Sequence, residues 1–274
     1  MTLQRGAAAA AVGGLLTLVA NCYADEAEAV KALKKLTATI QYDNKAAGKP
    51  VKSVNLSEAG VKDSDLKWMK EFKHLRFLGL DGTKVTDAGM RELKDLKTLQ
   101  TLRLASTKVG DAGLRELKGL TGLTMLGLGG TKVTDAGLRE LKDLTALRDL
   151  RLINTGITDA GLRELKELKE LRELMLSGTK VTDAGMKELK DLPRLQYLHL
   201  DKTRVTDAGL REMKEFPALE SLLLDKTNVT DAGLKELYQC QKLRVLNVYD
   251  TRVTEAGVRA LKAALPDVQV GYRR

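Results

Sequence analysis

The sequence predicts an α/β solenoid: a curved right-handed superhelix with a parallel β-sheet on its concave face and short helices on its convex face. Three observations predict this fold class. A residue pattern returns every 24 positions. Inside each copy, a strand-like period of two alternates with a helical period. Because strands pack about 4.8 Å apart and helices need about 10 Å, a stack of such copies must curve with its strands inside.

The first 24 residues are typical of a secretory signal peptide. Arg5 precedes an uncharged stretch from Gly6 to Val19; at about 14 residues it is too short for a bilayer, which needs roughly 20. Cys22 and Ala24 fit as the small residues before a cleavage site. We therefore expect an exported protein of the periplasm, cell envelope or extracellular space, without a transmembrane segment after cleavage. The competing interpretation is a lipoprotein signal with a lipid anchor at Cys22, although Asn21 stands where such signals carry Gly, Ala or Ser.

Residues 25–50 are expected to form an N-terminal cap made of a helix and a strand. The stretch "EAEAVKALKKL" fits a helix that turns Ala29, Leu33 and Leu36 inward, and "TATIQY" fits a strand before the turn "NKAAGKP". After signal cleavage only Cys240 would remain as a thiol, so the chain could form no internal disulfide. Stability must then come from packing.

Nine 24-residue repeats are expected over residues 51–266. In residues 75–98, "LRFLGLDGTKVTDAGMRELKDLKT", the segment "LGL" has the period of a strand buried on one face, and "DAGMRELKDL" has one apolar helical face. A degenerate first copy begins at Val51. Stacked copies share a continuous core, so stability is a sum of repeat and neighbour terms. The template positions expected inside are Leu75, Leu78, Leu80, Thr83, Val85, Ala88, Met90, Leu93 and Leu96.

Two further positions follow from the template. Cys240 takes the place of Leu96 in its own repeat, so it is expected in the core. Residues 267–274 place Val270 and Tyr272 where another strand belongs, which predicts a C-terminal cap strand.

The repeat "LxxLxLxxTxVTDAGLxxLxxL" resembles the leucine-rich repeat, and is similar to the cysteine-containing and GALA-type classes with their "(I/V)TDxG(L/A)xxL" turn. The resemblance covers all nine units and implies a leucine-rich repeat solenoid of the kind found in exported bacterial proteins. Thr83 and its copies stand where other leucine-rich repeats carry Asn or Cys. The resemblance implies much less about function.

The turn "TDAG" occurs six times, and "GDAG" and "TEAG" fill two further copies at the same spacing. We interpret this turn as structural. Either Thr86 or Asp87 would cap the following helix through its side-chain oxygen. Ala88 and Gly89 would be small because the chain turns tightly there, and the Thr83 hydroxyl would bridge adjacent repeats.

Composition and motifs disfavour several classes of function. The stacked aspartates fit capping better than a metal site, which needs several oxygen ligands converging on one ion. The net charge of +9 is spread thinly over the repeats, and no interleaved aromatics mark a nucleic-acid groove. Neither a phosphate loop nor a nucleophile motif is present. We expect no enzyme activity, no cofactor, no metal and no nucleic-acid partner.

The remaining candidate site is the concave face. Positions on either side of the buried strand leucines point away from the core, and they vary between repeats whose framework is nearly constant. Large apolar groups are expected to be exposed there, and contiguous apolar patches mark contact surfaces. The predicted binding residues are Phe77, Arg103, Met125, Asp149, Arg151, Glu173, Met175, Tyr197, His199, Leu223 and Tyr249.

These observations favour a monomeric, non-catalytic scaffold that binds a protein through its concave sheet. Apolar and aromatic side chains would supply affinity, and the charged ones orientation. The alternatives are an exposed face that has simply drifted, and a structural or envelope-associated spacer that weakly binds glycans or anionic surfaces. A minor alternative is an adaptor similar to the repeat domain of F-box proteins, although residues 25–50 leave no room for a second docking domain.

Overall fold

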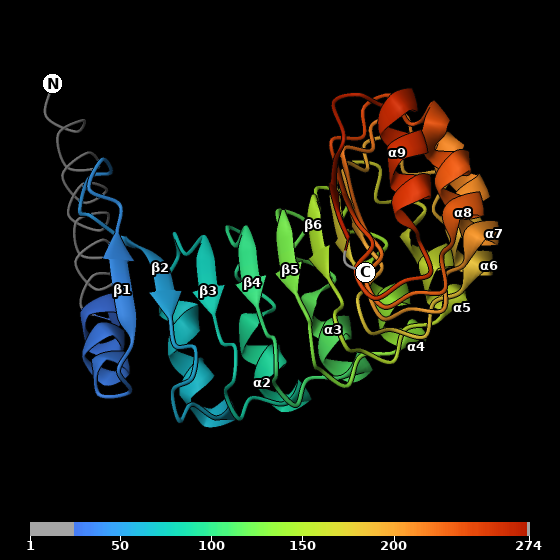
Figure 1. Ribbon diagram of the computed structural model, residues 1–274. Helices are drawn as coiled ribbons and strands as arrows, with labels where there is room; N and C mark the ends of the chain where they lie inside the picture. Colours follow the sequence, from blue (N-terminus) through green and yellow to red (C-terminus); the bar gives the residue numbers. More distant parts are fainter. Residues whose placement is uncertain (1–24, 273–274) are drawn as a thin grey trace, which may run out of the picture.

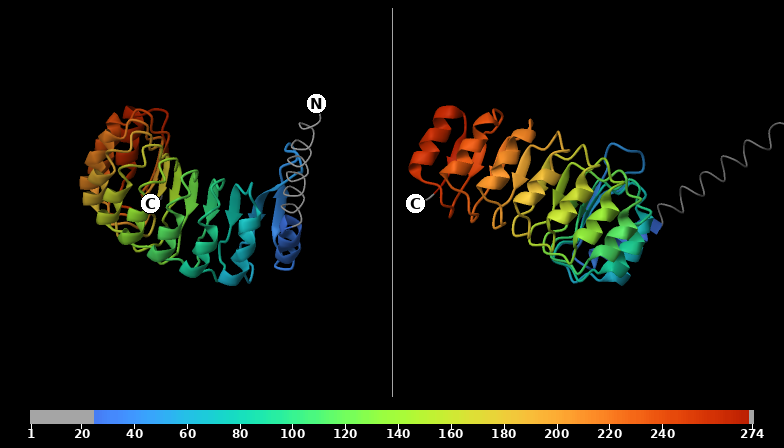
Figure 2. Two further views of the ribbon diagram at one scale, coloured as in Figure 1. Left: turned by 180° about the vertical axis from the view of Figure 1, so that it is seen from behind. Right: turned by 90° about the vertical axis from the view of Figure 1, so that its right-hand side faces the viewer.

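The computed structural model describes residues 25–272. It shows one continuous sheet bent into an arc, with its strands along the inner side and its short helices along the outer side (Figure 1; Figure 2). The order of the strands in the sheet follows their order in the chain from β1 to β11. The predicted fold class is therefore confirmed.

The strands are β1 (Thr39–Tyr42), β2 (Val51–Asn55), β3 (Phe77–Gly79), β4 (Thr101–Arg103), β5 (Met125–Gly127), β6 (Asp149–Arg151), β7 (Glu173–Met175), β8 (Tyr197–His199), β9 (Ser221–Leu223), β10 (Val245–Asn247) and β11 (Gln269–Gly271). The α-helices are α2 (Asp87–Met90), α3 (Asp111–Leu117), α4 (Asp135–Leu138), α5 (Asp159–Leu162), α6 (Asp183–Glu188), α7 (Asp207–Leu210), α8 (Asp231–Glu236) and α9 (Glu255–Ala264). The 3-10 helices are η1 (Asp63–Glu71), η2 (Arg91–Leu93), η3 (Arg139–Leu141), η4 (Arg163–Leu165), η5 (Arg211–Glu215) and η6 (Leu237–Gln239).

Neighbouring parallel strands pair residues that lie 24 positions apart in the sequence. Each strand from β2 to β11 pairs in parallel with the next, so that Leu78, Leu102 and Leu126 stand side by side. The cap is the exception, because β1 runs antiparallel to β2 and pairs Ile40 with Val54. The sheet is thus parallel except at its first pair of strands. An antiparallel partner needs only the short loop between residues 43 and 50, whereas a parallel one would require a longer crossover.

The core is a single stack of aliphatic side chains between sheet and helices. Leu78, Leu93 and Leu99 are completely buried, as are their copies along the chain. Cys240 is buried as predicted, and burial raises the pKa of its thiol to about 11. Ala88 contradicts the template because it is exposed at the start of α2, while the adjacent Gly89 is buried.

The N-terminal cap closes the first end of this core. Residues 25–34 are helical, and Ala29 and Leu33 are fully buried against the first repeat. The Glu26 carboxylate accepts a hydrogen bond of 2.9 Å from the backbone N–H of Val51, which ties the helix to β2. The predicted signal segment and the lipid-anchor position Cys22 lie outside the described residues. No helix in the described part of the chain is long and apolar enough to cross a membrane.

The "TDAG" turn joins each repeat to the one before it. Thr86 caps α2 by accepting from the Ala88 N–H at 3.2 Å. Its own N–H and hydroxyl both donate to Asp63 of the preceding repeat, each at 2.7 Å. The same pair of bonds recurs between Asp111 and Thr134, and it continues along the stack to Asp231 and Thr254. We call this series the Asp–Thr ladder.

Of the two predicted capping alternatives the structure selects Thr86, and the predicted bridging role of Thr83 was wrong. Asp87 does not cap its own helix; its carboxylate instead accepts from the N–H of Gly110 in the next repeat at 2.6 Å. The Thr83 hydroxyl does not bridge repeats either, because it donates to the Leu80 carbonyl of its own repeat at 2.7 Å. The bridging role that was assigned to the buried threonine therefore belongs to the aspartate.

The first and the last repeat depart from this motif. In the first repeat Lys62 stands in the threonine position, where no earlier carboxylate is available, while Asp63 is kept. In the last repeat Thr254 is kept and Glu255 replaces the aspartate. Glu255 pairs with Arg259 of its own helix at 3.2 Å.

Candidate binding surface

The concave face is presented by the strands themselves. Each strand buries its central leucine, so the residues on both sides of that leucine face the hollow of the arc. Ten of the eleven predicted binding residues lie on the strands from β3 to β9, and Tyr249 follows β10. None of the eleven belongs to the buried core. The structure therefore brings them onto one surface, in rows that follow the strand register.

The surface divides into three zones rather than one apolar patch. Phe77 and Met125 lie toward the N-terminal end, where Thr101 separates them in the register. The centre carries charged side chains on β6 and β7. Beyond them, toward the C-terminal end, come Met175, Tyr197, His199, Leu223 and Tyr249. We call the last group the C-terminal apolar zone.

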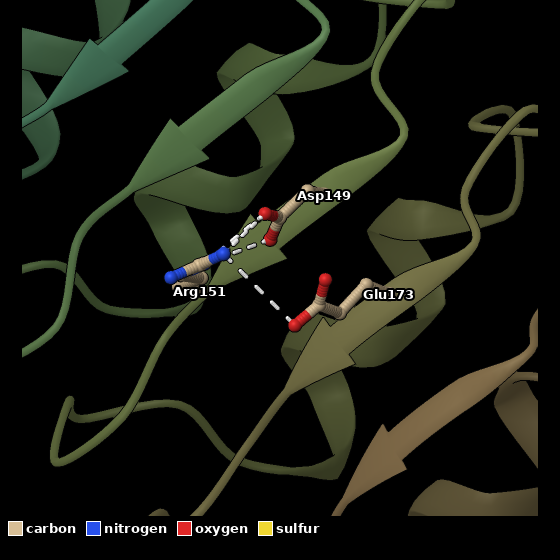
Figure 3. Close-up of polar contacts among 3 residues, drawn as sticks. All are labelled: Asp149, Arg151 and Glu173. Atoms are coloured by element: carbon tan, nitrogen blue, oxygen red, sulfur yellow. Dashed lines mark hydrogen bonds and ion pairs between the residues drawn. The ribbon is translucent and has the colours of Figure 1, made fainter. Parts of the chain in front are cut away.

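The central zone is an ion-pair cluster (Figure 3). The Arg151 guanidinium donates to Asp149 at 2.7 Å through Nη2 and at 3.1 Å through Nε. Glu173 on the neighbouring strand lies 4.0 Å from the same guanidinium. The hydrogen bond to Asp149 is the main cause that raises the pKa of Arg151 above its ordinary value. The two carboxylates exceed the one cation, so this zone presents a net negative charge.

A second set of carboxylates supports the loops that follow the strands. Asp81 accepts from the Ala105 N–H at 2.8 Å and forms an ion pair with Arg103. Asp225 accepts from the Tyr249 N–H at 2.8 Å, and burial raises the pKa of its carboxyl. These residues hold Arg103 and Tyr249 in place. Sequence reasoning named the supported residues but missed the supports, although the recurrence of Asp at this position was visible.

Exposure of the apolar side chains is lower than expected. Of the predicted apolar and aromatic residues only Tyr197 is exposed, with 39% of its surface accessible. The others are half-buried against the neighbouring strands: Phe77, Met125, Met175, Leu223 and Tyr249. Sequence reasoning left out Val245, which is 37% exposed and pairs in register with Ser221. It stands beside the C-terminal apolar zone and extends it by one strand.

The geometry of this face suits noncovalent contact. Arg103 and Arg151 are each already paired with a carboxylate, which fixes the positions of their guanidinium groups. His199 is half-buried between Met175 and Leu223 in the register. The Cys240 thiol lies in the core on the other side of the sheet and stays protonated near neutral pH.

A parallel strand, a short outer helix and a 24-residue period define a class of curved, repeat-built binding scaffolds. The comparisons with known proteins agree. The sequence pattern of the leucine-rich repeat region matches residues 53–190, just over half of the chain, so the chain belongs to the leucine-rich repeat family.

Two solved structures are similar to this one. Internalin C2 of Listeria monocytogenes has 20% sequence identity and a TM-score of 0.53, with 81% of each chain covered. A leucine-rich repeat protein of Leptospira interrogans has 21% identity and a TM-score of 0.57, with 74% of this chain and 56% of that chain covered. At these identities the likeness shows the fold alone. No curated protein matches the chain at a significant level.

Proposed function

We propose that this protein is a non-catalytic scaffold that binds a protein partner through the concave sheet, with the C-terminal apolar zone as the main contact. The observation that carries the proposal is the row Met175, His199 and Leu223 on three adjacent strands, with the exposed Tyr197 beside it. Binding energy concentrates in a few well-packed aromatic and apolar groups. A leucine-rich repeat family member with such a row is suited to binding rather than catalysis.

The charged centre gives the proposed contact its orientation. Asp149 and Glu173 border the apolar zone and favour a partner with basic groups at that position. Charges at the edge of an interface mainly set specificity and the association rate. The expected partner therefore presents an apolar patch with Lys or Arg next to it.

The experiment is affinity capture from envelope and extracellular extracts, with the bound proteins compared by mass spectrometry. Met175→Asp and Tyr197→Asp should each remove the specific partner, because a carboxylate would be desolvated in the interface. The matched control is Lys166→Asp, an exposed position on the outer side of the arc. Equal partner sets for wild type and the concave variants would reject the proposal.

A spacer that touches anionic surfaces only through diffuse charge is the competing function, favoured by the net charge of +9. Raising the salt concentration separates the two. A diffuse contact is largely screened at about 1 M ionic strength, where the Debye length is roughly 3 Å. An anchored apolar contact should persist there.

We further propose that the protein is exported, is a monomer, and belongs to the leucine-rich repeat classes with a "TDAG" turn. Export rests on the composition of residues 1–24. The mass of the mature N-terminus tests it: a chain starting at Asp25 indicates a free exported protein, and a lipid adduct on Cys22 indicates an anchored one. An intact Met1 would contradict export through this segment.

A further inference from the structure

The cap and the first repeat together form a cleft at the N-terminal end of the concave face, apart from the C-terminal apolar zone. Its volume is about 390 Å³, within the range of small-molecule sites. Three strands contribute to it, because Thr39 pairs with Asn55, Gln41 with Ser53, and Ser53 with Phe77. The full lining is Thr39, Gln41, Lys52, Ser53, Asn55, Arg76 and Phe77.

Most side chains that line the cleft are polar. Four side chains carry a neutral hydroxyl or amide that both donates and accepts. Within residues 25–272, the side chains of Thr39, Gln41 and Ser53 have no hydrogen-bond partner. Asn55 uses its carbonyl oxygen for the Ser57 N–H at 3.1 Å and keeps its NH2 group free. The cleft therefore offers several unused polar groups around one aromatic ring.

Two cations border the same cleft. Lys52 on β2 and Arg76, which directly precedes β3, are neighbours, since the Arg76 N–H donates to the Lys52 carbonyl at 2.8 Å. Neither side chain makes an ion pair with any described residue. Most arginines on the outer side of the arc have a glutamate partner, as Arg163 has Glu188. A pair of cations without carboxylates beside a polar cleft is suited to bind a carboxylate from outside.

We propose that this cleft binds an acidic saccharide, with Phe77 packing against the sugar ring. Sugar hydroxyls donate and accept, as do the four neutral side chains of the cleft. The C–H face of a sugar can lie on an aromatic ring, and the carboxylate of a uronic acid would meet Lys52 and Arg76. An acidic peptide fits less well, because Phe77 is the only apolar residue in the lining.

The test is titration calorimetry with cellobiouronic acid and, as its neutral match, cellobiose. The acid should bind with a Kd below about 1 mM, and cellobiose at least about tenfold more weakly, because charge-assisted hydrogen bonds would be lost. Arg76→Gln and Gln41→Ala should each weaken binding of the acid by about tenfold. Circular dichroism checks that both variants remain folded.

The matched control is Arg148→Gln, since Arg148 holds the position of Arg76 three repeats later. This variant should bind the acid as wild type does, and so should Tyr197→Asp, which keeps the result separate from the proposed protein contact. Three outcomes would overturn the proposal: no saturation at about 10 mM acid, an equal loss in Arg148→Gln, or tighter binding of a capped Ser-Glu-Ser peptide, which would assign the cleft to acidic peptides.

Discussion

A single carboxylate per repeat holds two groups of the next repeat. Asp159 accepts from the N–H and the hydroxyl of Thr182 at 2.8 and 2.6 Å. Hydrogen bonds to a charged acceptor contribute more than neutral ones, on the order of 1.5–3 kcal/mol. Gly110 is the one member of the ladder that lacks the hydroxyl, so that interface keeps only its backbone bond to Asp87.

Replacing Gly110 with Thr should stabilise the protein. The backbone there is extended (φ −130), and a Cβ would meet Asp87 Oδ2 at 3.6 Å, which leaves room for the missing hydroxyl bond. Threonine also lowers the conformational entropy of the unfolded chain, because it has fewer backbone conformations than glycine. We expect the free energy of unfolding to rise by about 1–2 kcal/mol in urea denaturation.

Gly110→Ala separates the two effects. It restricts the unfolded chain but brings no hydroxyl, so it should give only part of the gain. If Thr and Ala stabilise equally, the hydroxyl bond contributes nothing at this interface.

The sequence period could not assign the partner of each side chain in the turn. Thr86 and Asp87 are neighbours, so a bond within one repeat and a bond to the next repeat predict the same spacing. The signal that could separate them lies in the first repeat. Lys62 replaces the threonine, for which no earlier repeat supplies a carboxylate, while Asp63 is kept and binds Thr86. A bond between repeats explains this departure, whereas a bond within one repeat does not.

The Asp–Thr ladder constrains which residues can occupy the start of each outer helix. A Cβ on Gly89 would lie 2.6 Å from Asp63 Oδ1, so the glycine is needed because a carboxylate of the preceding repeat occupies the space. The first repeat has no preceding carboxylate and carries Asp65 at this position. Asp65 accepts from the Lys62 N–H at 3.0 Å instead.

Gly209→Ala should therefore be destabilising although alanine favours helices. Its Cβ would lie 2.6 Å from Asp183 Oδ1, and moving that carboxylate weakens its bonds to Thr206. We expect a loss of about 1–3 kcal/mol in the free energy of unfolding, measured in urea. Gly156→Ala is the matched control, because its nearest contact would be 3.5 Å. Equal stability of the two variants would contradict the steric argument.

At the level of elements, the sequence predicted the strands and outer helices of the repeats because their apolar period is strong. It also placed the binding rows on one face. The antiparallel pairing of β1 and the cleft beside it could not be predicted in this way. The cap occurs only once, so no second copy indicates which of its residues pair. The partial burial of Met175 and Leu223 was not predicted, because it depends on how closely the curvature brings side chains of neighbouring strands together.

The whole molecule behaves as a linear array, so removing one complete period should leave a folded protein. Deletion of residues 134–157 joins Val133 to Thr158 and lets Asp111 bind Thr158 in place of Thr134. Such arrays add nearest-neighbour terms, and the urea m-value follows the surface buried. We expect one cooperative transition with an m-value lower by roughly a ninth.

Deletion of only residues 134–145 is the control for this experiment. It removes half a period and places a helix segment against a strand. This variant should lose cooperative unfolding. If it unfolds as cooperatively as the complete-period deletion, register between repeats does not determine stability.

The Asp–Thr ladder also gives the solenoid a direction. Every interior unit extends an acceptor forward and receives one from behind, so whole units can be added or lost internally without leaving a polar group unmatched. The final unit differs, because Glu255 turns back to Arg259 of its own helix. Lengthening the protein beyond that point would require Glu255 to become Asp. A fusion that joined residue 266 directly to residue 51 of a second copy would meet a mismatched joint, because Lys62 would stand in the threonine position that faces Glu255.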